Sequence, residues 1–205
     1  MKKSCFLFFG ISICFTPFLV LAQDSSKLYF SSSVGLLKPL STFAKSYNTS
    51  LALSSGIEYR IAKRYFLLGE VGLNAVKYNQ QNIDKSSAYL FQNTKSSVIS
   101  LGLNVGRIIQ PKPADAFSLS PYVGIGYINI GEPRLLVDKT SQIIRQQVKR
   151  MQGLFTKIGT RFSYKTNTKA IQNVFFDVSY WNAYLLVQES KPQAFIFVFG
   201  TKIGF

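Results

Sequence analysis

Histidine is absent from this chain of 205 residues, and its two cysteines, Cys5 and Cys14, both lie near the N-terminus. Without an imidazole, hydrolysis by a Ser–His pair and histidine-assisted aspartyl chemistry are both excluded. If the N-terminal stretch is removed, the remaining chain has no disulfide, no thiolate metal ligand and no thiol nucleophile. The sequence therefore predicts a non-enzymatic protein with no catalytic residues, no cofactor-binding site and no metal site.

Acidic residues are scarce: the chain has 9 Asp and Glu residues against 24 Lys and Arg residues, a net charge of +15. Such an excess would usually suggest a nucleic-acid partner. Here the basic residues are scattered through turns and loops and form no stripe, so we expect no nucleic acid. Aromatic residues make up 15% of the chain and charged residues only 16%, which argues against disorder.

The N-terminus has the three parts of a secretory signal. Met1-Lys2-Lys3 is basic, Cys5 to Leu21 is almost entirely apolar, and Ala22 closes a small-residue cleavage site. We expect residues 1–22 to be a cleaved signal peptide and residues 23–205 to form one domain. Two alternatives are an uncleaved membrane anchor and a lipoprotein attached at Cys14, although a bulky isoleucine precedes that cysteine.

Long apolar runs are lacking after the signal, so no later segment could cross a membrane as a helix. Apolar and polar residues instead alternate, which indicates strands whose two faces differ. The alternating segments are Leu28–Leu37, Leu51–Ile61, Tyr65–Ala75, Ile99–Gly106, Ser118–Tyr127, Leu154–Tyr164, Val174–Trp181 and Ala194–Phe205. Their number and length predict an all-β fold, an eight-stranded antiparallel transmembrane β-barrel.

The connections between these segments also alternate in kind. Those at 62–64, 110–115 and 165–173 are short or marked by proline, whereas those at 41–49, 79–94 and 131–150 are polar and mostly longer. With both termini in the periplasm, we expect short periplasmic turns and longer extracellular loops. Residues 131–150 are either a loop or an extension of both flanking strands beyond the membrane.

The face opposite the apolar one carries charges that a lipid-facing surface would not tolerate. These are Glu58, Arg60, Glu70, Lys157, Arg161, Asp177 and Lys202. We expect them to lie in a narrow polar lumen as a structural ion-pair network, because unpaired buried charges are costly. Folding the sixth and seventh segments together places Arg161 opposite Asp177, with Lys202 beside Asp177. A general acid/base role for Glu58 and Glu70 is the less favoured interpretation.

The chain resembles the small outer-membrane β-barrel families, namely the OmpX/OmpA-type barrels and the PorT-like group. The resemblance rests on the signal peptide, the alternating segments and the terminal Gly200–Phe205. It implies a place in the cell outer membrane. It also implies that the outer-membrane assembly machinery reads the last strand, with Phe205, Ile203 and Phe199 as the assembly signal. The known enzymes among such barrels rely on a histidine, which this chain lacks.

The expected function is a structural or interaction role in which the barrel presents basic extracellular loops. The loop cations are Arg134, Lys139, Arg145, Lys149 and Arg150. Expected partners are outer-membrane lipid, including lipopolysaccharide, or an unidentified protein at the loops. The alternative implied by the PorT-like resemblance is an accessory component of a secretion or surface-assembly system. A small-solute pore and a soluble periplasmic ligand-binding barrel rank lower, since eight strands leave little free lumen.

Overall fold

The computed structural model describes residues 27–61, 64–78, 95–111, 116–138, 143–166, 168, 171–187 and 190–205. Its strands are β1 (Leu28–Pro39), β2 (Ser50–Ile61), β3 (Tyr65–Lys77), β4 (Lys95–Arg107), β5 (Phe117–Asp138), β6 (Ile143–Lys165), β7 (Asn173–Ala183) and β8 (Gln193–Gly204). One short helix, α1 (Phe43–Ser46), lies between β1 and β2. The expected signal peptide, residues 1–22, and the expected loop at 79–94 lie outside the described residues.

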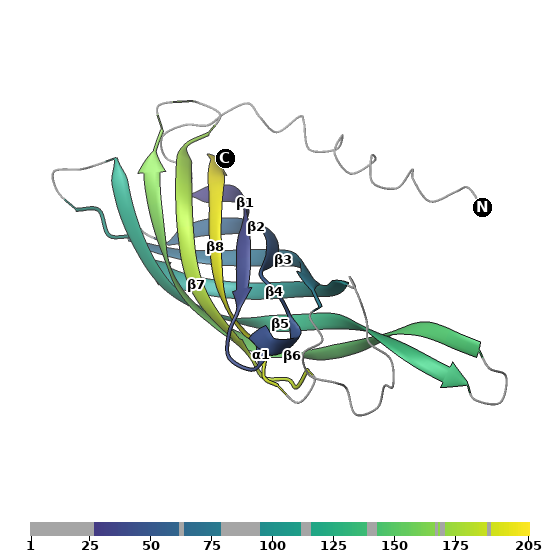
Figure 1. Ribbon diagram of the computed structural model, residues 1–205. Helices are drawn as coiled ribbons and strands as arrows, with labels where there is room; N and C mark the ends of the chain where they lie inside the picture. The colour runs from purple at the N-terminus through teal and green to yellow at the C-terminus, as the bar shows by residue number, and fades with distance from the viewer. Residues whose placement is uncertain are drawn as a thin grey trace, which may run out of the picture.

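The eight strands form a closed antiparallel barrel in which each strand pairs with its neighbours in sequence (Figure 1). β8 closes the sheet against β1, with Val34 opposite Phe199 and Tyr29 opposite Gly204. The predicted fold class is confirmed. In the part of the chain that the structure describes, no helix is long and apolar enough to cross a membrane.

The outer face of the barrel is apolar on every strand. Exposed side chains include Leu101 on β4, Ile125 on β5 and Leu154 on β6, at 61%, 67% and 65% of their full accessible surface. Their chain neighbours point inwards, because successive strand residues face opposite sides of a sheet. A soluble barrel would place its apolar face inside, so this orientation is the one that suits a bilayer.

The two ends of the barrel differ. We call "termini end" the end with Leu28, Phe205 and the connections after β2, β4 and β6. We call "loop end" the opposite end, with α1, the β5–β6 tip and the connection between β7 and β8 (Figure 1). The short connections that the sequence predicts to be periplasmic therefore all lie at the termini end.

β5 and β6 continue well beyond the barrel at the loop end (Figure 1). β4 leaves β5 at the Ser97–Gly131 pair, and β7 leaves β6 at Phe155–Ala183, yet β5 and β6 stay paired as far as Asp138–Ile143. Residues 131–138 and 143–150 thus extend the two flanking strands as a paired ribbon, here called the hairpin. Of its expected cations, Lys149 and Arg150 are exposed, the backbone of Arg134 and Arg145 is strand, and Lys139 lies outside the described residues.

The loop half of the lumen is apolar, which corrects the expectation of a polar interior throughout. The connection at 41–49 is not a plain polar loop, because α1 turns inwards and buries Phe43 and Tyr47 completely. Their rings lie 4.7 Å apart, and Phe43 lies 6.5 Å from Trp181. The other members of this apolar cluster include Leu37, Val76, Val98, Ile128, Ile130, Phe155, Val187 and Val198. Their burial seals the lumen at the loop end.

Candidate functional site

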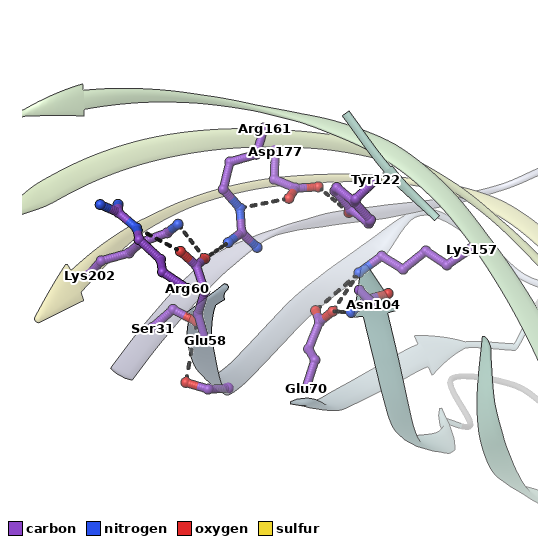
Figure 2. A network of polar contacts seen from close by, with 11 residues as sticks. Ser31, Glu58, Arg60, Glu70, Asn104, Tyr122, Lys157, Arg161, Asp177 and Lys202 are labelled. Atoms are coloured by element: carbon purple, nitrogen blue, oxygen red, sulfur yellow. Dashed lines mark hydrogen bonds and ion pairs between the residues drawn. The ribbon is translucent and has the colours of Figure 1, made fainter. Parts of the chain in front are cut away.

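The half of the lumen nearer the termini end holds the charged residues singled out from the sequence (Figure 2). They come from five strands: Glu58 and Arg60 from β2, Glu70 from β3, Lys157 and Arg161 from β6, Asp177 from β7 and Lys202 from β8. The structure brings all of them into two contacting groups. Arg60, at 32% side-chain exposure, is the most accessible to solvent.

Glu58 is the centre of the first group and is fully buried. Arg161 Nη1 lies 3.2 Å from Glu58 Oε2, and the Lys202 ammonium contacts the same oxygen. Arg60 Nε lies 3.7 Å from Glu58 Oε1, a longer and less direct contact. Three cations therefore surround one carboxylate that water does not reach.

Arg161 extends this group to Asp177, which lies directly opposite it in the β6–β7 register. Arg161 Nε donates to Asp177 Oδ2 at 3.0 Å, and Tyr122 OH donates to Asp177 Oδ1 at 2.7 Å. The Arg161 guanidinium also lies 4.3 Å from the centre of the Phe175 ring. Its donors are directed in a fixed fork, so one arginine can orient two carboxylates at once.

The prediction that Lys202 lies beside Asp177 is wrong. In the β7–β8 register, Val198 faces Asp177 and Lys202 faces Asn173, near the end of both strands. On its other side, Lys202 faces Ser31 of β1, and Ser31 faces Gly56 of β2, two residues from Glu58. The Lys202 ammonium therefore reaches Glu58 across β1.

Glu70 and Lys157 form the second group, closer to the middle of the barrel. Lys157 Nζ lies 2.8 Å from Glu70 Oε2 and 3.1 Å from Oε1, and Asn104 Nδ2 donates to Oε2 at 3.0 Å. The Lys157 ammonium lies 5.6 Å from the centre of the Tyr122 ring. Tyr122 thus touches both groups, one through its hydroxyl and the other through its ring.

Small residues on the inward face make room for this network. A Cβ atom at Gly159 would lie 2.7 Å from the Tyr122 hydroxyl, closer than atoms that are not bonded approach. At Gly126, a Cβ atom would lie 2.5 Å from the Phe155 ring. Glycine at these positions is therefore needed for the large side chains opposite, and it is not part of a phosphate-binding loop.

The chemical capacity of the lumen is small. Glu58, Glu70 and Asp177 each contact a cation, and within the described residues no group of three or more metal-ligating side chains gathers. A cavity of about 30 Å³ between the charged and apolar halves is lined by Glu70 and Lys157 on one side and by apolar residues such as Phe155 and Trp181 on the other. It has room only for molecules the size of water. The arrangement holds strands together, and this cavity is too small for a substrate.

Three members of the network were not singled out from the sequence. Tyr122, Asn104 and Phe175 lie on the same inward face as the charges but carry no charge themselves. Their position on the inward face was the available signal, because every second residue of those strands faces the lumen.

The proposed assembly residues lie on the outer face of the last strand. Phe199 is 57% exposed and Phe205 is 45% exposed, while Ile203 is partly covered. The Phe205 N–H donates to the Leu28 carbonyl at 3.0 Å, which fastens the chain end to the first strand.

No protein-family model matches this chain, and no curated protein sequence matches it. Solved structures do match. Neisserial surface protein A (NspA) is similar with a TM-score of 0.54 at 14% identity, over 88% of this chain and 98% of that one. A major outer membrane protein from Thermus thermophilus is similar with a TM-score of 0.51 at 12% identity, over 87% and 99%. The chain therefore has the fold of the small outer-membrane β-barrels.

Proposed function

We propose that this protein is a non-enzymatic barrel of the bacterial outer membrane that anchors a basic hairpin at the cell surface. The observation that carries the proposal is the combination of an apolar outer face with a lumen filled by side chains. A closed barrel pairs every backbone group of its strands with a neighbouring strand, so it can lie in a bilayer without leaving polar backbone groups unpaired.

The distribution of aromatic residues supports a membrane position. Tyr59, Tyr65, Phe162 and Tyr164 are all exposed on the outer face near the termini end. Aromatic side chains gather at the interfaces of membrane barrels, where their rings meet the headgroups. These residues fit the periplasmic boundary of the apolar band.

The filled lumen supports a structural role over a pore. The ion-pair network blocks the half nearer the termini end, and Phe43, Tyr47 and Trp181 fill the half nearer the loop end. A solute would have to displace buried charges and then a packed aromatic cluster. The functional surface is therefore expected outside the barrel, at the β5–β6 hairpin.

The charge of that hairpin suggests the kind of partner. Lys149 and Arg150 are exposed on β6 where the hairpin leaves the barrel. A basic segment just outside a membrane attracts anionic headgroups. We propose that the outer-membrane lipid, including lipopolysaccharide, is the first partner of this surface.

Single cysteines test the proposed topology, because the chain has no cysteine after Cys14. Gln147 is exposed on the hairpin, and Thr168 is exposed at the termini end. We expect a membrane-impermeant maleimide to label Gln147→Cys on intact cells, and Thr168→Cys only after the outer membrane is permeabilised. Outer-membrane fractions should also show heat-modifiable gel migration. Labelling of Thr168→Cys on intact cells would reverse the topology, and recovery in the soluble periplasmic fraction would refute the proposal.

A further inference from the structure

We propose that the outer face of β3, β4 and β6 at the loop end is a binding site for lipid A. In this site, Lys77, Lys95 and Arg150 hold the headgroup phosphates, and an apolar groove below them holds an acyl chain. The inference rests on the proposed function, because it requires the loop end to lie in the outer leaflet.

The first observation is a cluster of exposed cations. Lys77 and Lys95 are exposed and lie directly opposite each other on β3 and β4. Like charges in directly opposed positions destabilise a sheet. Among the residues that the structure describes, no carboxylate forms an ion pair with Lys77, Lys95 or Arg150. An anionic ligand would relieve the repulsion between the two lysines.

Arg150 completes the cluster from β6. It pairs with Gly131 of β5, which pairs in turn with Ser97 of β4, two residues from Lys95. Two strand spacings and two residues put Arg150 and Lys95 about 12 Å apart at their Cα atoms. Both side chains are long enough to converge on one headgroup.

The cluster marks the border of the apolar band. On β4, Ser97 follows Lys95 and then the outward residues become Ile99 and Leu101. On β6, Arg150 is followed on the outer face by a glutamine and then by Leu154. Cations at this height face the headgroup layer, where phosphates lie.

The second observation is a groove in the outer surface further along the same strands. It has a volume of about 610 Å³, and the apolar residues of its outward-facing walls are Leu67, Leu103, Val105, Val123, Ile125 and Ile158. Thr156, Tyr180 and Asn182 line its edge on β6 and β7. The walls on β3, β4 and β5 are apolar, which suits a hydrocarbon chain.

The distance between cluster and groove fits one lipid. Leu103 is eight residues along β4 from Lys95, and Ile158 is eight residues along β6 from Arg150. Eight residues of a strand tilted by about 45° descend roughly 19 Å. Half of a hydrocarbon core about 30 Å thick is about 15 Å, so the groove lies close to the bilayer midplane, a few ångströms beyond it, at the level where acyl chains end. The cation cluster at the headgroup level and the apolar groove below it together favour a lipid that carries both phosphates and acyl chains.

The opposite side of the barrel supplies a matched control. Lys38 on β1, Lys45 on α1 and Lys191 before β8 are also exposed cations of the loop end. No residue of β1, α1 or β8 lines the groove. A purely diffuse attraction to anionic lipid would use both sets equally.

The test is a titration of the folded protein in neutral detergent micelles with lipid A, with bound lipid counted by native mass spectrometry. The triple variant Lys77→Gln/Lys95→Gln/Arg150→Gln should bind lipid A roughly 100-fold more weakly, and the triple variant Lys38→Gln/Lys45→Gln/Lys191→Gln less than about threefold more weakly. Val123→Trp, which fills the groove and leaves the cations in place, should weaken binding roughly tenfold.

Equal losses in the two triple variants would overturn the inference, as would equal binding of lipid A from which the phosphates have been removed. Unchanged binding by Val123→Trp would overturn the groove as the acyl site. The maleimide labelling separates this inference from the proposed function. If Gln147→Cys is labelled on intact cells and lipid A does not bind, the lipid A site is wrong while the outer-membrane topology of the proposed function stands.

Discussion

Arg161 of β6 reaches straight across the barrel to Glu58 of β2, with Nη1 3.2 Å from Oε2. These strands are four places apart in either direction around the closed sheet, so the contact spans the full width of the lumen. Neighbouring strands are joined by backbone pairing, but opposite walls are joined only through side chains. The ion-pair network therefore joins opposite walls of the barrel through side chains.

Arg161→Met should destabilise the barrel strongly. It leaves Glu58 with fewer counter-charges and Asp177 without its arginine, and loss of one partner of a buried pair costs about 3–5 kcal/mol. Equilibrium unfolding in urea, with the protein in detergent or lipid vesicles, measures this loss. Arg60→Met is the control, because Arg60 is partly exposed and its contact is 3.7 Å long, so a loss below about 1 kcal/mol is expected. Equal losses of unfolding free energy in the two variants would show that the contacts of Arg161 across the lumen do not stabilise the barrel.

Lys157 and Glu70 should behave as a coupled pair. Lys157→Met leaves Glu70 without its cation, and Glu70→Gln leaves a buried ammonium without its carboxylate. Each single variant should be less stable, and the double variant should lose less than the sum by about 0.5–3 kcal/mol. A double-mutant cycle of unfolding free energies measures this coupling. Strict additivity would mean that the two side chains do not interact in the folded barrel.

Gly159→Ala should be destabilising because its Cβ atom would meet the Tyr122 hydroxyl and the Ser179 Cβ atom at 2.7 Å. Overpacking of this kind costs about 1–3 kcal/mol. Gly69→Ala is the matched control, since nothing lies within 4 Å of a Cβ atom there. The folded fraction in a heat-modifiable gel assay and the free energy of unfolding report both variants. An effect at Gly69 as large as that at Gly159 would contradict the packing argument.

Deletion of Phe205 should impair assembly into the outer membrane while leaving signal cleavage unchanged. Phe205 lies on the exposed outer face, and its N–H is fastened to Leu28. Phe205→Tyr keeps an aromatic ring at the chain end and should assemble normally. Quantitative blotting of outer-membrane fractions measures the yield, and the size of the accumulated chain reports cleavage. An unchanged yield after deletion would remove Phe205 from the assembly signal.

The purified barrel should show no steady conductance in planar bilayers. The lumen is filled by charges at one level and by Phe43, Tyr47 and Trp181 at the other. Phe43→Ala removes part of the apolar filling but leaves the ion pairs, so we expect it to stay closed as well. Stable single-channel steps from the unaltered protein would show that the lumen opens.

The outer face of the barrel was predictable because period-two alternation determines which residues lie together on a strand. Ile99, Leu101 and Leu103, for example, had to share one side of β4. The closure of β8 on β1 followed from the even strand count, and it is confirmed. The extension of β5 and β6 was left open because the same residues could form a loop or a ribbon.

The burial of α1 and the partner of Lys202 could not be predicted, because both depend on contacts between segments that are far apart in the sequence. α1 is four residues long, too short to show a helical pattern, and it is buried through Phe43 and Tyr47 from an otherwise polar stretch. Folding the sixth and seventh segments correctly placed Arg161 opposite Asp177. The partner of Lys202 depends instead on how β8 pairs with β1, at the other end of the chain, and no turn between the two strands fixes that register. For that reason Asp177, on the adjacent strand, was the wrong neighbour for Lys202.

β5 and β6 run without interruption from the wall of the barrel to the hairpin tip. Asp138 lies seven residues beyond Gly131, the last β5 residue that pairs with β4. At about 3.3 Å per residue, the tip stands roughly 23 Å clear of the remaining strands. The same two strands carry Tyr122, Lys157 and Arg161 further down. A force applied at the tip would therefore be transmitted along β5 and β6 into the barrel wall, where Lys157 and Arg161 connect β6 to Glu70 of β3 and Glu58 of β2.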